Sequence, residues 1–77
     1  MDEVYKSRQI HTSPQLNQDT DCWIPQADVS WDEQGTKQRQ LLGGPPDRFK
    51  IIDQAEIYAL EMAKAWIDAE CIDNLTP

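Results

Sequence analysis

The stretch IDQAEIYALEMAKAWIDAECI, residues 52–72, decides the fold of this chain. Asp53 suits the N-cap of a helix, because its carboxylate can accept a hydrogen bond from a free backbone N–H group of the first turn. Glu56 follows three residues later, which is the spacing of a capping box. We therefore predict a helix over residues 54–71.

One side of this helix is apolar. Alanine and large apolar side chains recur at spacings of three and four residues, and polar side chains occupy the opposite side, as expected for a helix that packs on a core. The apolar side carries Ala55, Tyr58, Ala59, Met62, Ala63 and Trp66. Since alanine is small, the helix can lie close to a sheet.

Three strands are expected before the helix. Residues 22–31 alternate, with Trp23, Pro25, Ala27, Val29 and Trp31 on one parity, although Pro25 weakens the first half; this period of two is typical of a half-buried strand. Residues 5–16 alternate less well and contain Pro14, which cannot donate to a central ladder, so they predict an edge strand. A turn ending at Gly35 leads to a third strand over residues 36–42.

The order of elements is therefore β-β-β-α. The sequence Gly-Gly-Pro-Pro at 43–46 ends the third strand, because its prolines lack an N–H donor and its glycines permit a sharp reversal. We predict an α+β fold, a three-stranded antiparallel meander with one C-terminal helix packed on one face, forming a single small domain over residues 1–77. Which face of the first and third strands is buried stays open, because a slip of one residue exchanges the faces.

The segments ADVSWDE (27–33), GGPPDRF (43–49) and IIDQAEIYALEMAKAWIDAE (51–70) carry a resemblance. Over roughly residues 23–70 the chain resembles small uncharacterised bacterial proteins, of a type found among cyanobacterial reading frames, that end in an alanine-spaced helix closing on Trp-Ile-Asp. This resemblance implies a compact β-β-β-α domain. It implies no activity, and no functional residue follows from it.

The charge of the chain is strongly negative. Its 14 acidic and 7 basic residues give a net charge of −7, which disfavours general affinity for nucleic acid or anionic lipid. Residues 51–77 alone hold six acids and one base. No basic segment precedes an apolar run and no stretch is apolar enough for a membrane span, so we expect a cytoplasmic protein without membrane contact. Cys22 and Cys71 are expected to be reduced thiols, and whether they lie near each other stays open.

No pattern of residues indicates a catalytic, cofactor or metal site. His11 is the only histidine and lacks a nucleophile or second ligand at a useful spacing. Asp28, Asp32 and Glu33 do not follow the spacing of a calcium loop and are better read as solvated side chains near a hairpin tip. We therefore expect no enzyme activity, no catalytic residue, no cofactor and no bound metal.

Two functional hypotheses remain. The first is a small acidic protein-interaction or regulatory module, monomeric or weakly dimeric, that binds another protein of unknown identity. Its candidate surface on the helix contains Ile57, Leu60, Glu61, Ile67 and Asp68. The alternative is a weak nucleic-acid-binding domain with a basic sheet face, and its candidate residues are Lys6, Arg8, Lys37 and Arg39.

Overall fold

The computed structural model describes residues 2–70, in which six strands precede one helix. The elements are β1 (Asp2–Tyr5), β2 (Arg8–Thr12), β3 (Gln15–Asn17), β4 (Cys22–Ile24), β5 (Gln26–Glu33), β6 (Thr36–Gly43) and α1 (Ile52–Glu70). Every strand pair is antiparallel. The α+β class and the position of the helix after the strands are confirmed.

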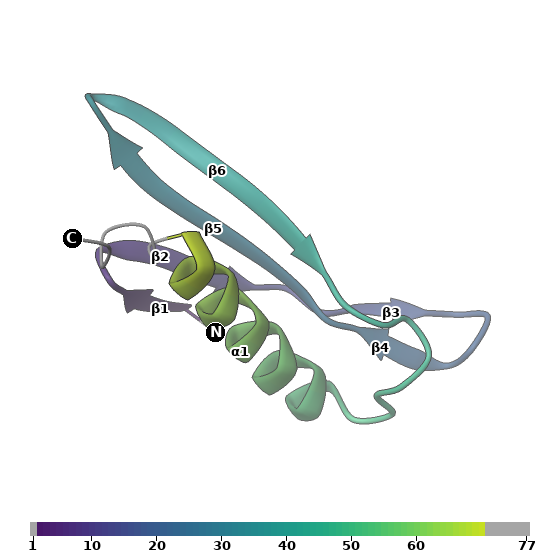
Figure 1. Ribbon diagram of the computed structural model, residues 1–77. Coiled ribbons are helices and arrows are strands. Elements are labelled where there is room, and N and C mark those ends of the chain that lie inside the picture. Colours follow the sequence, from purple (N-terminus) through teal and green to yellow (C-terminus); the bar gives the residue numbers. More distant parts are fainter. Residues whose placement is uncertain (1, 71–77) are drawn as a thin grey trace.

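The strands form two sheets. Four of them pair in the order β1-β2-β5-β6, and β3 and β4 form a separate two-stranded sheet. Figure 1 shows α1 lying along one side of the four-stranded sheet, while the tip of the β5–β6 hairpin extends beyond the helix. The predicted three-stranded meander is therefore wrong in detail, because β1 is added at one edge and the first two predicted strands are each divided in two.

The additional strand β1 depends on a turn that the sequence does not mark. Lys6 and Ser7 connect β1 to β2 with φ values of 50° and 66°. Two consecutive positive φ values are typical of a type I′ hairpin turn, which usually contains Asn or Gly. Because this turn lacks both residue types, the sequence predicts one strand over residues 5–16. The structure instead pairs β1 with β2, so β2 lies inside the sheet rather than at its edge.

Two prolines divide the predicted strands. Pro14 lies between β2 and β3, and the buried Pro25 lies between β4 and β5. Neither can donate a backbone hydrogen bond to a ladder. The backbone N–H of Ser13, just after β2, donates to the carbonyl oxygen of Gln26 at the start of β5 at 2.9 Å. This hydrogen bond keeps the chain segments of β2 and β5 adjacent where the four-stranded sheet ends.

The helix begins two residues earlier than predicted. The backbone N–H groups of Gln54 and Ala55 both donate to the carbonyl oxygen of Ile51, at 3.1 and 3.3 Å. Ile51 therefore occupies the N-cap position, and the predicted cap at Asp53 is wrong. Asp53 lies inside the first turn, where a negative charge still stabilises the positive end of the helix dipole. The predicted last residue, Cys71, lies outside the described residues.

The core lies between α1 and the four-stranded sheet. Ala55, Ala59, Ala63 and Ile67 form a fully buried stripe on the helix. The sheet contributes the buried side chains of Ile10, Ala27 and Val29. The partly buried residues around this core are Tyr5, Trp31, Leu42, Leu60, Met62 and Trp66. The predicted inward face of residues 27–31 is confirmed.

Candidate functional site

No element within residues 2–70 covers the face of the four-stranded sheet that lies opposite α1 (Figure 1), and we call it the open face. Because side chains alternate between the two faces of a strand, the neighbours of the buried Ile10, Ala27 and Val29 point to this side. The strand register arranges them in two rows. One row contains Asp2, His11, Asp28 and Leu41, and the other contains Val4, Gln9, Ser30 and Arg39.

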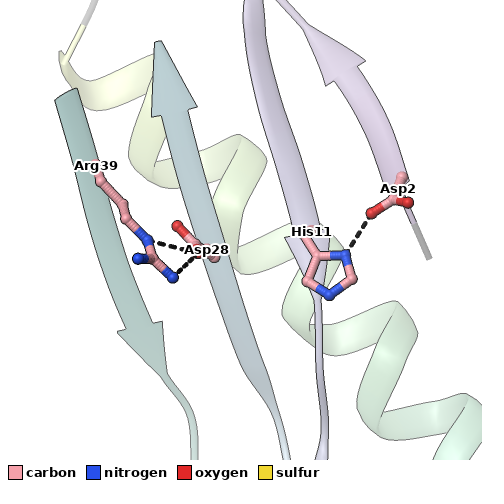
Figure 2. A network of polar contacts seen from close by, with 4 residues as sticks. All are labelled: Asp2, His11, Asp28 and Arg39. Carbon is pink, nitrogen blue, oxygen red and sulfur yellow. Dashed lines mark hydrogen bonds and ion pairs between the residues drawn. The ribbon is translucent and has the colours of Figure 1, made fainter. Parts of the chain in front are cut away.

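Two ion pairs cross the open face (Figure 2). The ring nitrogen Nδ1 of His11 contacts a carboxylate oxygen of Asp2, and this hydrogen bond holds the pKa of Asp2 below its usual value. Arg39 reaches from one row to the other. Its Nε donates to Oδ2 of Asp28 at 2.7 Å, and this hydrogen bond raises the pKa of Arg39.

Asp28 is a charged residue of this face whose side chain is largely buried. Its side chain is 20% exposed, whereas that of its partner Arg39 is 67% exposed. Arg39 contacts only Oδ2, and the other carboxylate oxygen, Oδ1, is buried and has no hydrogen-bond partner within residues 2–70. A buried acceptor without a donor costs about 1–3 kcal/mol, so a donor supplied from outside would be stabilising.

Two adjoining depressions lie on the open face around His11 and Asp28. One, of about 460 Å³, is lined by residues of β1, β2 and β5, and the other, of about 340 Å³, by residues of β2, β5 and β6 together with Ser13. His11 and Asp28 line both. Val4 and Leu41, 67% and 65% exposed, add apolar contacts on the two outer strands. The open face therefore carries the carboxylate of Asp28, a hydrogen-bond acceptor, between the apolar side chains of Val4 and Leu41.

The predicted interaction surface on the helix does not form. Ile67 is fully buried, because it continues the alanine stripe at a spacing of four residues, and Leu60 packs against the core. Asp68 is held by Lys6 at 2.7 Å and by the hydroxyl of Tyr5 at 3.0 Å. Ile57 and Glu61 are exposed. The prediction that these five helix residues share one exposed surface is wrong.

The predicted basic face does not form either. Arg8 lies on the helix-covered side, with its guanidinium carbon 4.1 Å from the ring centroid of Trp31. Lys6 lies in the β1–β2 turn and pairs with Asp68. Lys37 and Arg39 share the open face, since they are two residues apart on β6. The strand register thus separates the four basic residues that the alternative hypothesis assigns to one sheet face.

Sequence reasoning missed the central row of the open face. His11 lies on the polar parity of residues 9–13, so the alternation itself places it opposite Ile10 and Thr12. No sequence pattern indicates the contact between His11 and Asp2. This contact depends on the β1–β2 turn, which contains neither Asn nor Gly. The sequence indicates only a solvated acid at Asp28, near the hairpin tip, and gives no signal for its pairing with Arg39 or for its buried oxygen. Within residues 2–70, no group of three His, Cys, Asp or Glu side chains is placed to hold a metal ion.

No protein-family model, curated protein or solved structure matches the chain. In the part of the chain that the structure describes, no helix has both the length and the apolar character needed to cross a membrane.

Proposed function

We propose that the chain is a non-enzymatic module that binds another protein through its open face. The observation that carries this proposal is the buried Oδ1 of Asp28, which has no hydrogen-bond donor within residues 2–70 and lies in a hollowed sheet face that none of the described elements covers. The partner would supply a donor to Oδ1 of Asp28 and apolar contacts to Val4 and Leu41. This surface replaces the helix surface predicted from the sequence.

The charge of the chain favours a positively charged partner segment. Asp2 and Asp28 line the larger depression from the open face, and the whole chain carries a net charge of −7. Such a field attracts cationic surfaces and raises their association rate, an effect that salt weakens. The same field opposes a nucleic acid, which is itself a polyanion.

Other parts of the proposal come from the residues alone. The resemblance of residues 23–70 to small bacterial proteins with a Trp-Ile-Asp helix is consistent with a bacterial protein. We propose a cytoplasmic location and action as a monomer or weak dimer, without a cofactor. No enzymatic activity is part of this proposal, because its supporting observations concern binding only.

Affinity capture from the native lysate tests the proposal, with the tagged wild-type chain treated or not treated with nuclease. We expect a stoichiometric protein partner that resists nuclease. Leu41→Ser and Asp28→Asn should each reduce its recovery at least tenfold. Ile57→Ser serves as the matched control, because Ile57 is 56% exposed on the helix, and it should retain the partner.

Two results would contradict the proposal. One is equal capture by the open-face variants and by Ile57→Ser, provided that circular dichroism shows all of them folded. The other is material that disappears on nuclease treatment. The second result would favour the nucleic-acid hypothesis, and charge reversal at Lys37 and Arg39 would then test it.

A further inference from the structure

Two buried hydrogen-bond donors without a partner lie in one cluster of side chains on the helix-covered side of the sheet. The guanidinium carbon of Arg8 is 4.1 Å from the ring centroid of Trp31 and 5.6 Å from that of Trp66. The two indole rings are 5.6 Å apart and tilted by 46°. We call these three residues the arginine–tryptophan cluster. Cation–π attraction holds the guanidinium against the rings, although it supplies no hydrogen-bond acceptor.

Two buried donors of the cluster lack an acceptor. Nη1 of Arg8 and Nε1 of Trp31 are both buried, and neither has a hydrogen-bond partner within the described chain. Their burial removes the water molecules that would otherwise accept these hydrogen bonds, and this loss costs free energy. Both atoms are donors, and they belong to side chains in direct contact. The cluster therefore lacks one kind of group, an acceptor.

The carboxylates near the cluster already have partners. Asp68 pairs with Lys6 at 2.7 Å, and Glu3 pairs with Lys64 at 2.7 Å. Within residues 2–70, Arg8 has no carboxylate within ion-pair distance. In a chain with twice as many acidic as basic residues, an arginine without a carboxylate is unexpected. Residues 2–70 therefore supply no acceptor for the two buried donors.

We infer that the arginine–tryptophan cluster binds a carboxylate carried by another molecule. The planar guanidinium matches the two oxygens of a carboxylate, and the indole N–H supplies a further donor nearby. A phosphate dianion carries more negative charge and is repelled more strongly by a chain of net charge −7. The three side chains are only partly buried, and binding would require the guanidinium to turn until its N–H groups face the acceptor.

This site is separate from the open face, because the two lie on opposite sides of the sheet. The carboxylate can come from a side chain of a protein or from a free carboxylic acid, and both have the same chemistry. The inference goes beyond the proposed function and does not depend on it. The result of the capture experiments with open-face variants therefore neither supports nor contradicts carboxylate binding by the arginine–tryptophan cluster.

A titration of the ¹⁵N-labelled full chain, followed by NMR at pH 7 and constant ionic strength, tests the inference. The probes are sodium acetate, the blocked peptide acetyl-Gly-Glu-Gly-amide and inorganic phosphate, with sodium chloride as the reference salt. We expect a saturable shift of the Trp31 indole N–H signal with a carboxylate probe, and at least tenfold weaker binding of phosphate. Saturation by the peptide identifies a protein side chain as the ligand, whereas saturation by acetate alone identifies a free acid.

Trp23 is the internal control, because it does not belong to the cluster and should not shift. Arg8→Gln should abolish saturation, whereas Arg39→Gln, an equal loss of charge on the open face, should preserve it. Three results would overturn the inference: linear shifts, equal shifts of all three indole signals, or saturation that persists in Arg8→Gln. The wild-type titration is decisive even where a variant fails to fold, since Trp23 is present in the same molecule.

Discussion

The two faces of the four-stranded sheet differ sharply, although the same strands build both. On the covered face, Ile10 and Val29 are buried against the alanine stripe of α1. One residue away from them, after Ile10 and before Val29, His11 and Asp28 belong to the open face and to its ion pairs. A step of one residue therefore separates the part of the sheet that stabilises the fold from the part available for binding.

The two faces contribute differently to stability because apolar burial and exposed ion pairs differ in free energy. Burial of apolar surface contributes about 25 cal/mol for each Å² removed from water. An exposed ion pair contributes only about 0.2–1 kcal/mol. Substitutions on the covered face should consequently change stability, and those on the open face should mainly change binding. Four predictions test this comparison, from the largest expected effect to the smallest.

Two isoleucines on the same helix give the largest contrast. Ile67→Ala should lower the free energy of unfolding by about 2–5 kcal/mol, because it leaves a cavity beneath a fully buried side chain. Ile57→Ala, at a position 56% exposed, should change it by less than about 0.5 kcal/mol. Urea denaturation of both variants measures the difference. Equal losses would contradict the placement of Ile67 in the core.

Two alanines test how closely the helix approaches the sheet. Ala63→Leu should destabilise the protein by about 1–3 kcal/mol, because the larger side chain must fit where Ala63 is fully buried. Ala65→Leu is the matched control on an exposed position of the same helix, and it should be nearly neutral. Thermal unfolding followed by circular dichroism compares them. A neutral Ala63→Leu would mean that the two layers are loosely packed.

Adjacent leucines on β6 compare the two faces directly. Leu42 packs against the core and is partly buried, whereas Leu41 is 65% exposed on the open face. Since complete burial of leucine makes truncation cost about 2–5 kcal/mol, Leu42→Ala should cost about 1–2 kcal/mol. Leu41→Ala should cost less than about 0.5 kcal/mol. Chemical denaturation that ranked them in the reverse order would show that β6 has its faces exchanged.

The smallest effect concerns the link between the end of α1 and the β1–β2 turn. Hydrogen bonds from Lys6 and Tyr5 lower the pKa of Asp68 below its usual 3.8. The ionised carboxylate is therefore favoured in the folded state, and its contribution is fully present above pH 3.8. It is lost as the pH falls through the lowered pKa of the folded state. Because Asp68 is 48% exposed, solvent screens this contribution and keeps it small.

NMR titration of the side-chain carboxyl carbon of Asp68 measures this pKa directly. The wild-type chain should show a value below 3.8, and Lys6→Met should move it back toward 3.8. A wild-type value at or above 3.8 would contradict the contact. Urea midpoints measured between pH 7 and pH 2 should fall less in Asp68→Asn, because this variant has no carboxylate to protonate at that position.

Much of the fold could be predicted from periodicity. The spacing of apolar residues predicted the helix, and the alternation of residues 27–31 predicted which face of β5 is buried. The division of strands at Pro14 and Pro25 was only partly visible, because a proline indicates a missing donor without showing where pairing resumes. The helix start was misplaced, since Ile51 serves as N-cap through its backbone carbonyl and no side chain marks it.

The candidate sites were less accessible to sequence reasoning. Ile67 continued the spacing of Ala59 and Ala63, and this signal should have assigned it to the core. Arg8 has the same parity as Ile10, so alternation could have placed it on the covered face once that face was known. The unmet acceptor of Asp28 and the unmet donors of Arg8 and Trp31 had no sequence signal. They exist only because packing removes water from particular atoms.

Local physics fixes the features that can be read along the chain: an amphipathic helix, a half-buried strand with its inward face, a glycine-containing turn and a strong negative charge. Only the tertiary structure decided the pairing of β1, the separation of the four basic residues and the atoms left without hydrogen-bond partners. These features depend on strand register and on desolvation. Both arise when distant segments meet, so neighbouring residues in the sequence do not specify them.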